Sequence, residues 1–266
     1  MYRTRVGNVE IVSLFDVYFG FDPHRVWPTA GDRLEAYRNR LEPNGDIGMD
    51  CLCFLLRADG RTILVDTGLG PESGGVLLDE LREAGVRPDE IDDVIFTHLH
   101  GDHTGWNMDR ATGQPLFTRA RYLVPEGDWD DQTSRQLPSS SFSRDIAPLQ
   151  WMKRMELVGD GHPLSPSLTT VHTPGHTPGH LSIDVRSGGE RGFILGDVFL
   201  TTIDVEEDDW SGMFDSDPAQ ASATRKTILD RLEADGALVA GAHLRAPGIG
   251  RVVRVDGRRF WQGVTV

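Results

Sequence analysis

A histidine-rich segment at residues 97–103 constrains the fold of this chain more than any other feature. It reads Thr-His-Leu-His-Gly-Asp-His and directly follows the apolar run Val94, Ile95 and Phe96. Three imidazoles and one carboxylate at the end of a strand can converge on one point, as a zinc ion requires. Packing alone does not explain four such side chains within six residues. The segment therefore predicts a metal site at a strand end, around which the chain must fold.

Three further candidate ligands stand at other predicted strand or turn positions. His176 lies in a turn rich in proline and glycine, residues 173–180, which can aim one imidazole inward. Asp197 and His243 each follow a short apolar run. Side chains delivered by several strand ends can meet at one edge of a sheet. We therefore expect these three residues to join the histidine-rich segment.

Short apolar runs separated by turn residues predict many strands with a few interspersed helices. Strands are expected at residues 9–14, 51–56, 62–66, 94–97, 121–124, 168–172, 181–185, 193–196, 237–241 and 251–255. Helical patterns lie at residues 76–84, 218–234 and 32–41. Asp217 is the expected N-cap of the second helix, and Gly236 lies just past its end. This mixture predicts a layered α/β or α+β domain.

Length and charge narrow the classes of function. We expect one domain over residues 1–266, since neither a repeat nor a linker divides the chain. The 27 basic and 41 acidic residues give a net charge of −14, which disfavours nucleic acid and anionic membranes as partners. No apolar run has the length of a membrane helix, and the first residues do not resemble a signal peptide. Cys51 and Cys53 are expected to be reduced packing residues of a cytoplasmic protein.

Two long stretches, residues 19–48 and 126–166, match no regular element in the sequence pattern. Both contain several aromatic residues among prolines, glycines or serines. Long loops in a compact domain often cover a binding site. We interpret the two stretches either as loops over the active site or as surface cover packed by its own aromatic side chains.

Together the motifs resemble those of the metallo-β-lactamase superfamily. The matching pieces are residues 64–68 (Leu-Val-Asp-Thr-Gly), the histidine-rich segment, the Thr-Pro-Gly-His turn, Gly196-Asp197 and Gly241-Ala242-His243. The resemblance covers nearly the whole chain. It implies an α/β fold of the four-layer αββα sandwich type, with metal ions at one edge of the two sheets.

The resemblance also implies a set of ligands for two zinc ions per chain, with iron or manganese as alternatives. The first ion is assigned to His98, His100 and His176, the second to Asp102, His103 and His243, and Asp197 bridges both. Asp66 matches an aspartate that orients a ligand.

The remaining polar candidates receive simpler interpretations. His172 and His180 flank the ligand turn and are expected to be structural or to orient a ligand. Asp50 is expected to be a turn residue. The acidic run 204–209 is expected to be a solvated loop that disfavours anionic substrates near the site.

A two-metal site of this kind suits hydrolysis, because two cations lower the pKa of a shared water. We expect a bridging hydroxide to open a small neutral or apolar ester, first of all a lactone such as an acyl-homoserine lactone. Asp102 is the expected proton carrier to the leaving group. The alternatives on the same site are an aryl ester or organophosphate hydrolase and a thioesterase. An iron-dependent redox enzyme of the same fold is the alternative from another class.

Two departures refine the expected substrate. Many zinc β-lactamases have cysteine where Asp197 stands, so the resemblance favours lactonases, esterases, glyoxalase II or phosphotriesterases over β-lactamases. The long segment before Asp66 resembles that of quorum-quenching lactonases and methyl parathion hydrolase-like enzymes. Such lactonases often have tyrosine three residues after the bridging aspartate, where this chain has Leu200. A mechanism that uses that hydroxyl is therefore not expected. The expected partners are a small-molecule substrate and, because family members are often dimers, a second copy of the chain.

Overall fold

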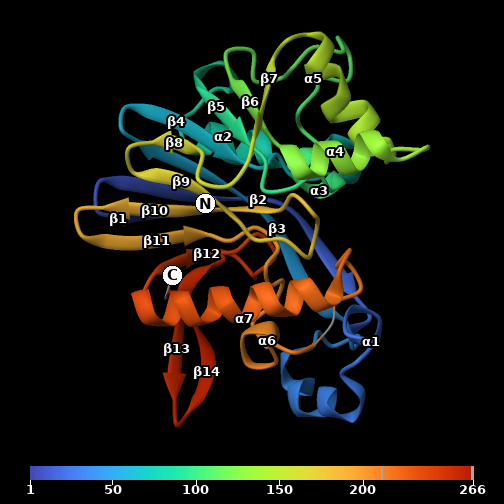
Figure 1. Ribbon diagram of the computed structural model, residues 1–266, viewed down its shortest axis with the longest axis vertical. Helices are drawn as coiled ribbons and strands as arrows, with labels where there is room; N and C mark the ends of the chain where they lie inside the picture. The colour runs from blue at the N-terminus through green and yellow to red at the C-terminus, as the bar shows by residue number, and fades with distance from the viewer. Residues whose placement is uncertain (211, 265–266) are drawn as a thin grey trace.

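Two seven-stranded sheets pack face to face in the computed structural model, which describes residues 1–210 and 212–264 (Figure 1). The first sheet has the order β1-β2-β3-β4-β5-β6-β7, with strands Tyr2–Val6, Val9–Phe21, Ile47–Ala58, Arg61–Val65, Asp93–Ile95, Arg121–Pro125 and Met155–Val158. The second has the order β14-β13-β12-β11-β10-β9-β8, where β8 to β14 are Pro163–Ser165, Leu168–His172, Leu181–Ser187, Glu190–Ile194, Leu238–Ala240, Ile249–Val255 and Arg258–Gly263.

Helices cover the outer face of each sheet and complete the αββα layers. The α-helices of the described residues are α1 (Pro23–Val26), α2 (Leu77–Glu83), α3 (Gly101–Thr104), α4 (Glu126–Ser134), α5 (Ala147–Trp151), α6 (Ile203–Glu206) and α7 (Pro218–Asp235). Three 3-10 helices are η1 (Gly31–Arg40), η2 (Pro71–Ser73) and η3 (Pro88–Glu90), and a single π-helical turn is η4 (Phe142–Ile146). Helices α2, α4 and α5 lie over the first sheet and α7 over the second (Figure 1). Within the described residues, the structure contains no helix that is both long enough and apolar enough to cross a membrane.

The central strand β3 shows why the layers stack in this way. Successive side chains of a strand point to opposite faces of the sheet. Leu52, Phe54 and Leu56 join the core between the two sheets, whereas Cys53 and Leu55 join the core beneath the outer helices. All five are buried, which explains the nearly continuous apolar sequence of this strand. The cysteines are free and buried, as packing residues should be.

The N-terminal stretch 19–48 contains more regular structure than the sequence predicted. Strand β2 continues to Phe21, and β3 already begins at Ile47, so that Phe19 pairs with Met49 in the sheet. The helix expected at 32–41 is a 3-10 helix, η1. Both ends of the stretch are therefore strand, and its middle contains the short helices α1 and η1.

Residues 126–166 form α4, η4, α5, β7 and β8 rather than a long loop. The sequence conceals these elements because α4 is strongly polar and Trp129 is its only large apolar side chain. That ring packs against Phe142 at a centroid distance of 5.2 Å and thereby anchors the helix to the outer core. By contrast, α7 begins after its N-cap Asp217 and ends at Asp235, with Gly236 just past its end, as predicted.

Candidate metal centre

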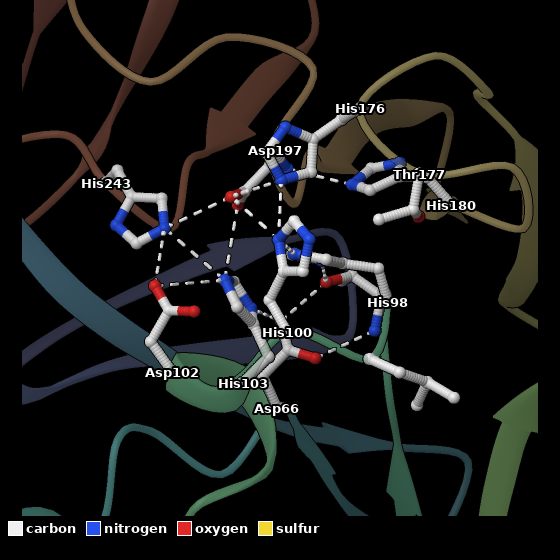
Figure 2. A network of polar contacts seen from close by, with 12 residues as sticks. Asp66, His98, His100, Asp102, His103, His176, Thr177, His180, Asp197 and His243 are labelled. Carbon is white, nitrogen blue, oxygen red and sulfur yellow. Dashed lines mark hydrogen bonds and ion pairs between the residues drawn. The ribbon is translucent and has the colours of Figure 1, made fainter. Parts of the chain in front are cut away.

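The structure brings all the predicted metal ligands together at one edge of the two sheets (Figure 2). The first sheet supplies four of them, from the segment after β5 and from α3. The second sheet supplies the other three, from the turns that follow β9, β11 and β12. The seven residues are His98, His100, Asp102, His103, His176, Asp197 and His243.

Three histidines form the first cluster. His100 Nδ1 lies 3.0 Å from His98 Nε2 and 3.0 Å from His176 Nε2. A tetrahedral zinc ion with bonds of about 2.0–2.1 Å separates its ligand atoms by roughly 3.3 Å. The spacing of these three nitrogens therefore fits one metal ion.

Two histidines and a carboxylate form the second cluster. His103 Nε2 and His243 Nε2 are 3.3 Å apart. Asp102 Oδ2 lies 3.4 Å from the His243 nitrogen and 3.8 Å from the His103 nitrogen. This set also suits a divalent transition metal, because it combines imidazole and carboxylate ligands.

Asp197 lies between the two clusters. Its Oδ2 is 3.3 Å from His176 Nε2 and 3.2 Å from His243 Nε2, so the carboxylate reaches both. Its Oδ1 is buried and has no hydrogen-bond partner among the described residues. That oxygen lies 3.5 Å from His103 Nε2, and a buried carboxylate oxygen without a hydrogen bond is costly unless a cation neutralises it. The residues present thus fit two metal ions that share Asp197.

Two histidines of the first cluster are in the protonation state that binds a metal ion. Burial lowers the pKa of His98 well below its ordinary value. Burial and the neighbouring His176 lower the pKa of His100 to about 4. Both imidazoles are therefore neutral near pH 7, which is the form that binds a metal ion.

In the second cluster, neighbouring carboxylates raise the pKa values of the histidines. Burial alone would lower the pKa of His103, but Asp197 and Asp66 outweigh it and hold that pKa well above its ordinary value. The pKa of His243 is raised in the same way by Asp197 and Asp102. The raised pKa values of these two imidazoles favour their protonated forms, so a metal ion that binds at this cluster competes with protons.

Asp66 fixes the orientation of His103. Its Oδ2 lies 2.9 Å from His103 Nδ1, and its carboxylate also accepts hydrogen bonds from the Thr97 N–H at 2.7 Å and the Thr97 hydroxyl at 2.8 Å. Asp66 adopts a φ of +60°, which a non-glycine residue rarely does. The strained backbone places the carboxylate between two segments of the site. The same Thr97 hydroxyl lies 3.1 Å from His98 Nδ1.

Two further supports of the ligands were missed by the sequence analysis. Asp215 Oδ1 lies 3.1 Å from His176 Nδ1. The backbone carbonyl of Asp50 lies 3.0 Å from His243 Nδ1. Asp50 is therefore not a turn residue: it lies within β3, where its main chain holds a ligand. A main-chain acceptor has no signature in the sequence, and Asp215 belongs to no motif.

A buried carboxylate ties the ligand segments of the two sheets together. Asp128 Oδ2 accepts hydrogen bonds from the Leu99 N–H at 3.0 Å and the Thr177 hydroxyl at 2.9 Å, and its Oδ1 accepts one from the Gly179 N–H at 2.6 Å. Leu99 lies between two ligands of the first cluster, and Thr177 follows the third. Asp128 thus sets the spacing of that cluster although it belongs to none of the predicted motifs.

The acidic run 204–209 is not the solvated loop that the sequence suggested. Asp204 is buried and accepts a hydrogen bond from the Trp27 indole N–H at 2.7 Å. The acidic residues that follow it form ion pairs: Glu206 with Arg40 and Arg258, Glu207 with Arg33, and Asp208 with Arg259. The pairing removes the basis for expecting this run to repel anionic substrates.

A cavity of about 480 Å³ opens over the two clusters. Six of its lining residues are apolar: Phe19, Phe21, Met49, Leu69, Leu200 and Phe214. Phe21 meets Phe214 edge to face at a centroid distance of 5.3 Å, and the Phe19 ring lies 6.2 Å from the His243 ring. An aromatic wall therefore begins directly beside the second cluster.

Asp215→Asn is expected to weaken metal binding by roughly 10–100-fold, because the neutral amide is a poorer acceptor for the His176 Nδ1–H than a carboxylate. Competition with a chromogenic chelator measures the change. Asp217→Asn is the matched control, since Asp217 caps α7 two residues further along and asparagine caps equally well. An unchanged affinity in Asp215→Asn would contradict the proposed support of His176.

Known proteins match this chain in sequence and in structure. The sequence profile described as the metallo-beta-lactamase superfamily matches residues 47–243. Human metallo-beta-lactamase domain-containing protein 1 is 32% identical over 201 residues, which cover 74% of this chain and 64% of that protein, so the chain spans just under two thirds of its length. An N-acyl homoserine lactonase of a Bacillus species is 26% identical over 214 residues, covering 71% of this chain and 80% of that protein. The structure of AidC, described as a dizinc quorum-quenching lactonase, has a TM-score of 0.88 at 23% identity and covers 100% of this chain and 97% of AidC.

Proposed function

The chain belongs to the metallo-beta-lactamase superfamily, and from that premise we propose that it is a hydrolase that binds two divalent metal ions and opens small neutral or apolar esters, a lactone first among them. One observation carries the proposal. Two ligand clusters share the carboxylate of Asp197, and both border a cavity whose wall is apolar. Zinc is the proposed metal, because imidazole and carboxylate ligands at tetrahedral spacing suit it.

Divalent ions, if held by the two clusters, would supply Lewis acidity and would lower the pKa of a water toward 7. Asp102 is the residue of this chain that handles the proton. Burial alone would raise its pKa, but His103 and His243 outweigh it and keep the carboxylate ionised. Its side chain is 24% exposed and lines the cavity, so it can accept a proton from the attacking water and pass it to the leaving oxygen.

The lining of the cavity argues for an uncharged substrate. Neither lysine nor arginine occurs among the described residues that line it, so a substrate carboxylate held against the apolar wall, away from the metal clusters, would meet no basic side chain. The apolar wall suits an acyl chain, since burying its methylene groups contributes about 0.8 kcal/mol each. The N-acyl homoserine lactonase relative and the AidC fold support the choice of a lactone. Leu200 lines the cavity and supplies no hydroxyl, which leaves the proton transfer to Asp102.

Aryl esters and organophosphates are the second candidate class. The observation that favours them is the set of rings formed by Phe19, Phe21 and Phe214. Aromatic rings pair well in edge-to-face and offset arrangements. An aryl leaving group could therefore bind against this wall as favourably as an acyl chain.

The test is proton release from a medium-chain N-acyl homoserine lactone by protein loaded with zinc, followed with a pH indicator. An aryl ester, a phosphotriester and a thioester form parallel assays. Fast release from the lactone supports the proposal, and release from only one of the other substrates moves that class to the front. Metal analysis of the same sample should give about two ions per chain. A reproducible value near one after metal supplementation would contradict the shared site.

A further inference from the structure

His180 is a buried histidine beside the metal centre that belongs to neither ligand cluster. Its side chain is fully buried, and its ring centroid lies 5.2 Å from that of His98 and 6.0 Å from that of His176. Its Nε2 accepts a hydrogen bond from the backbone N–H of Asp197 at 2.9 Å. The ring thus contacts the main chain, rather than the carboxylate, of the residue that joins the two clusters (Figure 2).

The other ring nitrogen begins a short chain of hydrogen bonds. His180 Nδ1 lies 2.8 Å from Thr173 Oγ1, which lies 2.9 Å from Ser182 Oγ. The Ser182 hydroxyl donates to the Leu195 carbonyl at 2.8 Å. This series of hydrogen bonds therefore connects the backbone N–H of Asp197 to the backbone carbonyl of Leu195, two residues earlier.

The direction of every bond in this chain is determined. A backbone N–H can only donate, so His180 Nε2 is unprotonated and Nδ1 carries the proton. Thr173 Oγ1 accepts the hydrogen bond from Nδ1–H and must donate its own hydrogen to Ser182, because the Ser182 hydroxyl donates to the Leu195 carbonyl. Each of the two hydroxyls thus accepts one hydrogen bond and donates one, which fixes both the tautomer and the orientation of the ring.

The segment 195–197, which these hydrogen bonds hold, has few other restraints. Strand β11 ends at Ile194, and the Leu195 N–H makes one further bond to the Ala240 carbonyl. The backbone then turns at Gly196 with a φ of +62°. A Cβ at Gly196 would lie 2.5 Å from His180 Nε2, so the ring packs directly on this turn. At the position of Asp197, the sheet no longer determines the path of the main chain.

We propose that His180 is a positioning residue that places the shared Asp197 carboxylate by accepting its backbone N–H, with Thr173 and Ser182 fixing the ring. This inference rests on the proposed two-ion site. Loss of the acceptor lets the 195–197 turn relax, so that the carboxylate no longer reaches both clusters at once. The expected consequence is weaker metal binding, and the fold remains intact.

Two substitutions at His180 separate its two nitrogens. The glutamine amide of His180→Gln can place an acceptor near the Nε2 position, whereas the shorter asparagine amide of His180→Asn reaches only the Nδ1 position. His180→Asn is expected to lower metal affinity by roughly 10–100-fold. His180→Gln should restore most of that loss. Thr173→Val removes the hydroxyl that bonds His180 Nδ1, with little change in shape. Its metal affinity should lie between those of His180→Asn and His180→Gln.

The measurements use the metal alone and no substrate. Chelator competition gives the affinities for zinc, and the visible spectrum of the cobalt-loaded protein reports the geometry around the ions. The melting temperature of each metal-free variant reports the fold. The matched control is His172→Asn, because His172 flanks the same turn but is exposed and bonds only through Nε2 to the Pro178 carbonyl.

The outcomes distinguish this inference from the proposed function. Wild-type affinity and an unchanged cobalt spectrum in His180→Asn would overturn the positioning role. Equal losses in the Asn and Gln variants, matched by equal drops in metal-free melting temperature, would show a purely structural histidine and also overturn it. A wild-type protein that binds a single ion contradicts the two-ion site, and because no carboxylate is then shared, it overturns the positioning role as well.

Discussion

His103→Ala is expected to lower kcat/KM for the best ester substrate by roughly 10³-fold or more, because it removes a ligand of the second cluster and an anchor of Asp66. Such a loss corresponds to about 4 kcal/mol of transition-state stabilisation. Metal analysis should show the content falling from about two ions per chain to about one. Steady-state kinetics at saturating zinc separate the loss of the ligand from simple depletion of metal.

His172→Ala is the matched control for this experiment. It removes an imidazole of the same size from an exposed position near the site, and His172 belongs to neither cluster. Its turnover and metal content should equal those of the wild type. Turnover by His103→Ala close to that of the control would refute the assignment of the second cluster.

Phe54→Ala is expected to reduce the free energy of unfolding by about 3–5 kcal/mol. Phe54 is 2% exposed and lies in the core between the two sheets, opposite Val65 in the register with β4. The strands on both sides are hydrogen-bonded into their sheet, so they can close only part of the space that the ring leaves. Equilibrium denaturation of the metal-free protein measures the change.

Trp151→Ala provides the comparison, since it removes a larger ring from α5 at a side chain that is 78% exposed. This substitution should change the free energy of unfolding by no more than about 0.5 kcal/mol. Similar losses in the two variants would mean that the inter-sheet core does not dominate stability.

The fold was predictable wherever one element carries its own local signal. Strand 168–172 and the cap and stop of α7 lie where the sequence placed them. The elements that were missed depend on distant partners. Strand β14 holds polar and half-buried residues that pair with β13, and α4 is defined by the packing of Trp129. In these cases tertiary contacts outweigh local preference.

The clustering of the candidate ligands was predictable because they occur in dense motifs at strand ends, whereas the residues that hydrogen-bond to them were not. Asp215 and Asp128 stand alone in the sequence, and only the fold brings them to His176 and to the ligand turn. The acidic run shows the opposite error. A block of like charges looks solvated in sequence, but the arginines that neutralise it come from both ends of the chain.

The long β2–β3 ribbon has a consequence for how substrate preference can change. It starts in the core and continues, past a bulge between Phe15 and Val17, to the cavity, where Phe19 and Phe21 project from the same side of one strand. The backbone of this part of the wall cannot shift without breaking the strand pairing that also stabilises the fold. Phe19 and Phe21 therefore hold fixed positions in the cavity wall. At this wall, adaptation to a longer or bulkier acyl group therefore requires substitution of side chains rather than movement of the backbone.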